Sequence, residues 1–208
     1  MTRRNWILVL VLVGAFVVAC AIVIGGMVVI GRQIGHQAKV TPDPTLLTAA
    51  DKRLLLTAAD IERLGGPAVD PAAEEWKAQR QGTGTRSITY FYESSSVPRI
   101  SIYSRFALFP REDDARRMYK MDGMMLMLGP RGESYVPAPR LFPEGGDRGA
   151  WFIEKDGEAI GNFFLIRQGR LVQSARLTGL TLHEPSDVEK LLGPMLGESR
   201  RRTATMPP

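Results

Sequence analysis

The sequence has few of the residues that most often carry out covalent or metal chemistry. Its 208 residues include one cysteine, Cys20, and two histidines, His36 and His183. A single cysteine excludes an internal disulfide framework, and without paired cysteines or histidines a zinc site lacks its usual ligands. The acidic run at 112–114 does not have the alternate spacing of a calcium-binding loop. The sequence therefore predicts no metal site and no cofactor.

Motifs of known reactions are also missing. A serine–histidine–acid triad would need His183 together with a serine from the run 94–96, and no serine lies in the strand–turn–helix setting of a nucleophile elbow. His183 precedes Glu184-Pro185, which is typical of an exposed turn. We therefore expect a protein without catalytic residues. A hydrolase that uses His183 is the alternative.

Excess charge is confined to one end of the chain. The net charge is +5, but residues 1–39 contain four basic residues and no acid, which leaves 23 basic and 22 acidic side chains for residues 40–208. Such a balanced domain has no field that would attract a polyanion. The sequence therefore does not favour nucleic-acid binding, and the arginines at 200–202 are expected in a flexible basic tail over 199–208.

A long apolar run occupies the N-terminal region. The 25 residues from Trp6 to Ile30 contain no charge, and about 20 helical residues cross a bilayer. Val17-Val18-Ala19-Cys20 also resembles a lipobox, so Cys20 is the lipidation site if the segment is cleaved instead of retained. Because Arg3 and Arg4 precede the run, we expect a single-pass protein of the inner membrane with its C-terminal domain outside the cytoplasm.

The organisation expected from these patterns has five parts. They are a cytoplasmic N-terminus at 1–4, a transmembrane anchor at 5–31, a juxtamembrane linker at 32–45, an exported domain at 46–198 and the flexible tail at 199–208. Whether the chain is cut at Cys20 or keeps its anchor is left open.

Hydrophobic periodicity predicts the elements of the domain. Thr57 and Asp60 suit the start of a helix that ends before Gly65-Gly66, and Asp156-Gly157 predicts a hairpin turn. Strands are expected at 88–92, 100–108, 134–136, 151–155, 159–167 and 171–177; helices are expected at 57–64, 70–76, from 110 or 111 to about 128, and from 186. Hairpin-linked strands with intervening helices predict an α+β fold, an antiparallel sheet covered by helices, after a single N-terminal transmembrane helix.

The pattern resembles a known group of domains. Leu55-Leu56-Thr57 followed by Asp60-Ile61, Gly146-Asp147 before an aromatic strand, the strand end Arg167-Gln168-Gly169 and the closing helix are similar to small exported bacterial lipoproteins with a PsbP-like α/β fold. The resemblance covers roughly residues 54–197, and the cysteines of that family are absent here. It implies a membrane-tethered binding or accessory domain without catalysis.

Methionine is the most unusual local feature. Five of the nine methionines lie within ten residues, at Met118, Met121, Met124, Met125 and Met127. Because they surround the predicted helix, the pattern favours a helix buried on most of its circumference; a ligand groove or partner surface, lined also by Tyr90 and Tyr92, is the alternative.

These observations predict an anchored, extracytoplasmic binding or accessory domain. We expect it to recognise a partner protein in the membrane or envelope, or a small apolar ligand, and to attach to the membrane through residues 5–31. A structural subunit of a membrane complex is a further alternative. The oligomeric state and the identity of the ligand are not predicted.

Overall fold

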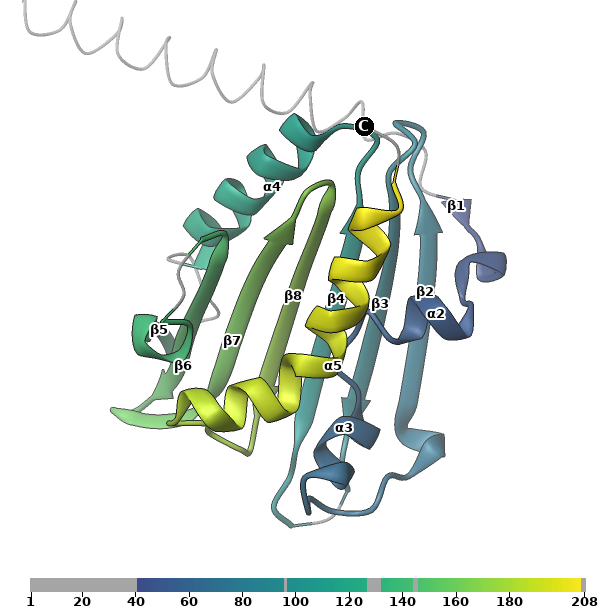
Figure 1. The fold of residues 1–208 in the computed structure, drawn as a ribbon. Coiled ribbons are helices and arrows are strands. Elements are labelled where there is room, and N and C mark those ends of the chain that lie inside the picture. The colour runs from purple at the N-terminus through teal and green to yellow at the C-terminus, as the bar shows by residue number, and fades with distance from the viewer. Residues whose placement is uncertain (1–40, 96, 127–131, 144–145, 207–208) are drawn as a thin grey trace, which may run out of the picture. The chain divides into compact units, whose positions relative to one another are not determined.

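The computed structural model describes residues 41–95, 97–126, 132–143 and 146–206. Within them, eight strands form one antiparallel sheet in the order β1-β2-β3-β4-β8-β7-β6-β5 (Figure 1). The strands are β1 (Thr41–Pro42), β2 (Glu74–Arg80), β3 (Arg86–Glu93), β4 (Ser101–Leu108), β5 (Glu133–Pro137), β6 (Arg148–Lys155), β7 (Glu158–Gln168) and β8 (Leu171–Thr178).

The sheet consists of two antiparallel meanders. The chain runs through β2, β3 and β4, then through helix α4 (Glu112–Met125), and then through β5 to β8. The meanders join where β8 pairs with β4, from Ser101 opposite Thr178 to Leu108 opposite Leu171. At the β6–β7 hairpin, Asp156 and Gly157 both have positive φ, as the predicted two-residue turn requires.

Short elements and one long helix cover the face of the sheet that is turned toward the viewer in Figure 1. They are α2 (Ala49–Lys52), α3 (Ala58–Arg63), the 3-10 turns η1 (Pro44–Leu46), η2 (Pro71–Ala73) and η4 (Pro139–Leu141), and α5 (Pro185–Ala204). Helix α5 is visibly bent, and Pro194 lies inside it, where proline removes a backbone hydrogen bond.

Alternate residues of the strands supply two separate cores. On β7, Phe164 belongs to the large cluster beneath α5, and its neighbour Leu165 belongs to a smaller cluster beneath α4. The smaller cluster also contains Ala115 of α4, which is fully buried. Because successive side chains of a strand point to opposite faces, α5 and α4 cover opposite faces of the sheet.

The expected membrane architecture is corrected. Within the described residues no helix is long and apolar enough to cross a membrane. The long helices α4 and α5 both carry charged side chains on their exposed sides, so each is amphipathic. The described residues form the eight-stranded antiparallel sheet with its C-terminal helix, and this finding contradicts the predictions of a single-pass transmembrane helix and of an inner-membrane location. The segment 5–31 on which those predictions were based, with Cys20, lies outside the described residues.

Several element boundaries also differ from the expectation. Residues 70–76, expected as a helix, form only the turn η2 before β2 begins at Glu74. Residues 199–204, expected in a flexible tail, continue α5, with Ser199 fully buried. Leu-Leu-Thr-Ala-Ala-Asp occurs twice, and both copies begin helices, since Thr48 accepts the Asp51 backbone N–H and Asp60 accepts the Thr57 backbone N–H.

Candidate functional site

The predicted site residues do not form one surface. Tyr90 and Tyr92 are buried in the large cluster beneath α5, whereas the methionine helix α4 lies on the opposite face. The structure therefore separates these tyrosines from the methionines. Tyr90 instead has a structural role: its hydroxyl accepts the Ala58 N–H at 3.0 Å and donates to Glu74 Oε1 at 2.9 Å. Burial is the main cause of its raised pKa.

Most of the methionines are exposed. Met118 packs partly buried against the small cluster, but Met121, Met124 and Met125 are 48%, 63% and 56% exposed. Met127 lies outside the described residues. The interpretation that α4 is buried on most of its circumference is therefore wrong, because only one stripe of the helix meets the sheet.

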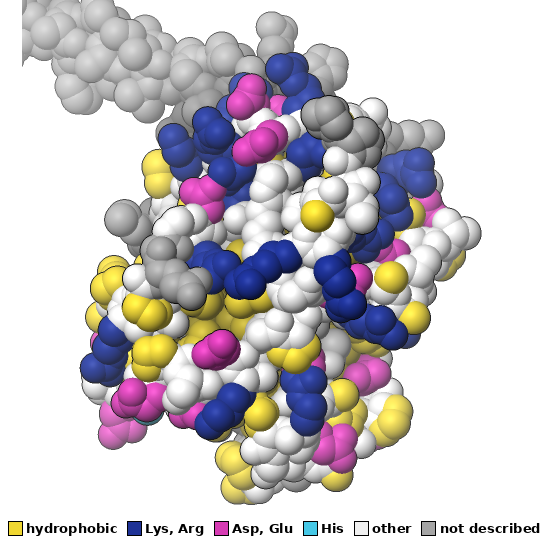
Figure 2. All heavy atoms as spheres, in the orientation of Figure 1, with side chains coloured by type: hydrophobic (Ala, Val, Ile, Leu, Met, Phe, Trp, Pro, Cys, Tyr) yellow, Lys and Arg dark blue, Asp and Glu magenta, His cyan; other side chains and the backbone are white. Residues whose placement is uncertain are grey.

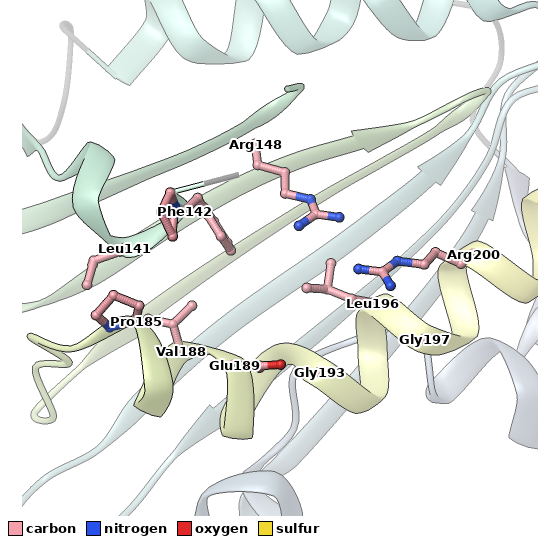
Figure 3. A pocket seen from close by; sticks show the side chains of 11 residues that line it. Leu141, Phe142, Arg148, Pro185, Val188, Glu189, Gly193, Leu196, Gly197 and Arg200 are labelled. Atoms are coloured by element: carbon pink, nitrogen blue, oxygen red, sulfur yellow. The ribbon is translucent and has the colours of Figure 1, made fainter. Parts of the chain in front are cut away.

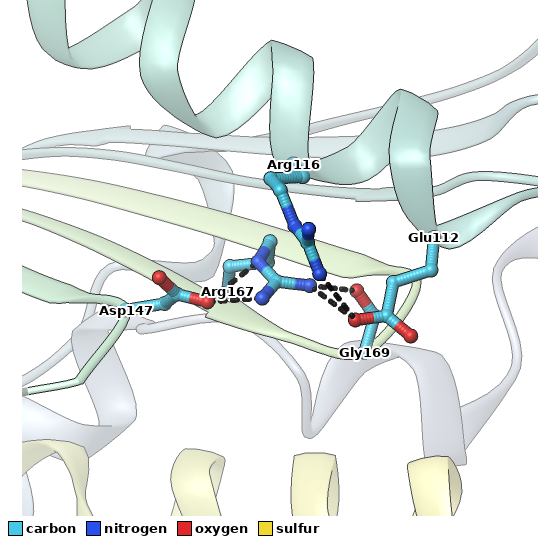
Figure 4. Close-up of polar contacts among 5 residues, drawn as sticks. All are labelled: Glu112, Arg116, Asp147, Arg167 and Gly169. Atoms are coloured by element: carbon cyan, nitrogen blue, oxygen red, sulfur yellow. Dashed lines mark hydrogen bonds and ion pairs between the residues drawn. The ribbon is translucent and has the colours of Figure 1, made fainter.

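An ion-pair network attaches the start of α4 to the sheet. Arg167 of β7, whose side chain is 10% exposed, donates to Asp147 and to Glu112 Oε1, the latter at 2.9 Å, and also to the Gly169 carbonyl at 3.0 Å (Figure 4). The pKa of Glu112 is lowered mainly by the hydrogen bond from Arg167 and, to a smaller extent, by the positive charge of Arg167. Each donor group has a protein acceptor, so this network is a fastening of α4 and not an open site.

His183 and the acidic residues form no recognisable reaction centre. His183 is exposed and lies against the ring of Phe152, with 5.5 Å between ring centroids. No group of three or more histidine, cysteine, aspartate or glutamate side chains in the described part of the chain could hold a metal ion.

A concave site lies between α5 and the start of β6. It is a cavity of about 240 Å³ on the face that α5 covers, and Figure 2 shows a hollow there, with hydrophobic side chains in its floor and Lys and Arg side chains along its upper border. The apolar lining includes Leu141, Phe142, Val188 and Leu196, three of which are almost fully buried. The cavity was not predicted, since one wall comes from residues 141–148 and the other from residues 185–200, which are far apart in the sequence.

Two arginines from different elements converge at this cavity. Arg148 begins β6 and Arg200 lies near the end of α5, and their guanidinium groups point toward each other across the opening beside Leu196 (Figure 3). The one acidic residue of the lining, Glu189, lies about three helical turns before Arg200 on α5. The lining therefore combines an apolar floor with two guanidinium groups at one end.

Two glycines give the α5 wall of the cavity an unusual surface. Gly193 and Gly197 are one helical turn apart, and a Cβ atom built on either meets no atom within 4 Å. Glycine inside a helix costs about 0.5–1 kcal/mol relative to alanine. Because no part of the described chain fills the space beside them, packing among the described residues does not explain these glycines.

Buried polar contacts fix the position of α5. Ser199 donates to Gln173 Oε1 at 2.9 Å, and Gln173 of β8 donates to the Leu54 carbonyl at 2.7 Å. Arg202 of α5 also forms an ion pair with the buried carboxylate of Asp51 in α2. The wall that carries Gly197 and Arg200 is therefore held rigidly against the sheet.

Comparisons with known proteins found no match, whether with family models, with curated proteins or with solved structures. The similarity to PsbP-like domains therefore stays a prediction.

Proposed function

We propose that this protein is a binding domain for a small ligand with an apolar body and an acidic group, which it holds in the cavity between α5 and β6. The observation that carries the proposal is the convergence of Arg148 and Arg200 at a cavity whose other lining residues, apart from Glu189, are apolar or glycine. Guanidinium groups pair well with carboxylate and phosphate oxygens, and small-ligand sites combine apolar walls with a few polar groups of this kind.

Each part of the lining matches one part of such a ligand. The buried side chains of Leu141, Val188 and Leu196 remove an apolar body from water. The space beside Gly193 and Gly197 lets that body approach the helix backbone, which any larger side chain would prevent. Binding of the ligand, without its chemical conversion, is the role that this lining supports.

Titration of the full chain with decanoate tests the proposal. Decanoate has one carboxylate and a linear apolar body, and we expect saturable binding with a Kd on the order of 10–100 µM by isothermal titration calorimetry. Substitution Gly197→Leu places a side chain at the cavity, and its Cβ atom meets no protein atom within 4 Å, so it should weaken binding at least about tenfold while the melting temperature stays equal or rises.

The matched control is Lys190→Leu, which adds the same side chain to α5 at an exposed position outside the lining. This variant should bind decanoate as the parent does. Absence of saturable binding to the parent, or equal binding by Gly197→Leu, would contradict the proposed function.

A further inference from the structure

A second cleft lies on the face of the sheet that α4 covers only in part. Helix α4 contacts β7 and β8, and on this face the described residues place no helix over β2 and β3. There the outward side chains of β2, β3 and β4, together with Gln81 just after β2, line a cleft of about 480 Å³. The cleft shares no lining residue with the cavity beside α5 and lies on the other side of the sheet.

An exposed aromatic pair lies in this cleft. Phe91 of β3 and Tyr103 of β4 are directly opposite each other in the strand register, and their side chains are 37% and 40% exposed. Cross-strand neighbours have Cβ atoms about 5 Å apart, so the two side chains leave the same face of the sheet side by side. Exposure of two large rings in register costs solvation free energy unless a ligand covers them.

Hydrogen-bonding groups that donate and accept line the rest of the cleft, along the strands from the pair. Gln79 and Gln81 contribute amides, and Ser87 and Thr89 contribute hydroxyls, although Ser87 is largely buried. These groups both donate and accept hydrogen bonds, so they match a ligand whose own groups do the same.

The charges of the cleft do not select an ionic ligand. Lys77 and Glu75 form an exposed ion pair at 2.8 Å, which leaves Arg105 as the remaining cation of the lining. Burial raises the pKa of Asp122 of α4, and the positive charge of nearby Arg105 opposes part of this rise. Since Glu75 pairs with one of the two cations of the lining, a single further arginine does not supply the row of cations that a nucleic acid requires.

From these features we infer that the cleft binds an uncharged oligosaccharide. A sugar ring has an apolar face of C–H bonds, which fits the Phe91–Tyr103 pair, and a rim of hydroxyl groups, each of which donates and accepts. An extended peptide would instead pair with backbone groups at a sheet edge, whereas this cleft presents side chains on a sheet face. The lining therefore matches a sugar better than a peptide or a nucleic acid.

The test is titration of the full chain with three soluble neutral hexasaccharides: cellohexaose, maltohexaose and chitohexaose. We expect saturable binding of at least one of them. Tyr103→Ala and Phe91→Ala should each weaken that binding about tenfold or more while the variant stays folded, because each side chain is more than a third exposed in the cleft.

Val136→Ala is the matched control, since Val136 is 38% exposed and lies on β5, outside the cleft. It should bind as the parent does. Failure of all three hexasaccharides to bind the parent would overturn the inference, as would binding that neither ring substitution weakens. A concentration-dependent sedimentation coefficient that the ring substitutions abolish would also overturn it, because the cleft would then be covered by a second copy of the chain.

Discussion

The two faces of the sheet are built from the same strands but differ in how completely they are covered. Beneath α5, side chains from β2, β3, β4, β6, β7 and β8 and from helices α3 and α5 join one continuous cluster. Beneath α4, the buried cluster has five members, and on this face the described residues place no helix over β2 and β3. Because burial of apolar area dominates stability, the α5 face holds the fold together, and the α4 face is free to vary with fewer consequences for folding.

Neighbouring residues of β7 allow a direct test of this difference. Phe164→Ala removes a fully buried ring from the large cluster and should lower the free energy of unfolding by about 3–5 kcal/mol. Leu165→Ala, on the opposite face, should cost about 2–3 kcal/mol, since the small cluster can collapse partly around it. Urea denaturation of both variants measures the difference, and a larger effect for Leu165→Ala would contradict the comparison.

The end of α5 should contribute next in size. Arg202 is the cationic partner of Asp51, whose side chain is only 2% exposed. Arg202→Ala should lower the free energy of unfolding by about 2 kcal/mol, because a buried carboxylate loses its partner. Arg201→Ala is the control, since Arg201 is 72% exposed and pairs only across the helix surface with Glu198. Equal effects in urea denaturation would mean that residues 199–204 act as the flexible tail that the sequence predicted.

A smaller, pH-dependent effect on stability is expected at the ion pair between Glu112 of α4 and Arg167 of the sheet. Pairing with Arg167 lowers the pKa of Glu112 below its ordinary 4.5, so this pairing stabilises the folded state above about pH 4.5 and the effect is lost as the pH falls through the lowered pKa. Glu112→Gln should therefore melt below the parent at about pH 7 and together with it at about pH 3. A difference in melting temperature that persists unchanged at acidic pH would have another cause.

The smallest effect is expected on the exposed side of α4. Met125 is 56% exposed, so Met125→Asp should change the free energy of unfolding by less than about 0.5 kcal/mol. The interpretation of a helix buried all round requires unfolding by the same substitution. Thermal melting of this one variant distinguishes the two.

Local signals explain which parts of the fold could be predicted. The turn at Asp156-Gly157 and the alternation along β3 and β4 depend on short-range chemistry, and the structure has these elements close to their predicted bounds. Strand β2 was missed because Glu74-Glu75-Trp76 follows a proline that favours a helix start, and only pairing with β3 makes the segment a strand. Pairing between strands cannot be inferred from the local pattern of residues in one segment.

The candidate sites needed the structure for the same reason. Nothing in the sequence places Arg148 beside Arg200, since 51 positions separate them and β7 and β8 lie between them in the chain. The methionine run was visible, but composition alone does not say which side of a helix meets the sheet. The methionines of α4 are unusual in composition, whereas the cavity beside α5 is lined by arginines and glycines, which are common residues and give no signal in the sequence.

The central claim is that the cavity beside α5 selects an apolar ligand by its acidic group, and a pair of ligands that differ only in that group tests it most directly. Titration followed by NMR should show that the parent binds decanoate about tenfold or more tightly than decanol, and that Arg200→Gln removes most of this preference. Equal affinity of the parent for decanoate and decanol, or a preference that Arg200→Gln leaves unchanged, would contradict the account.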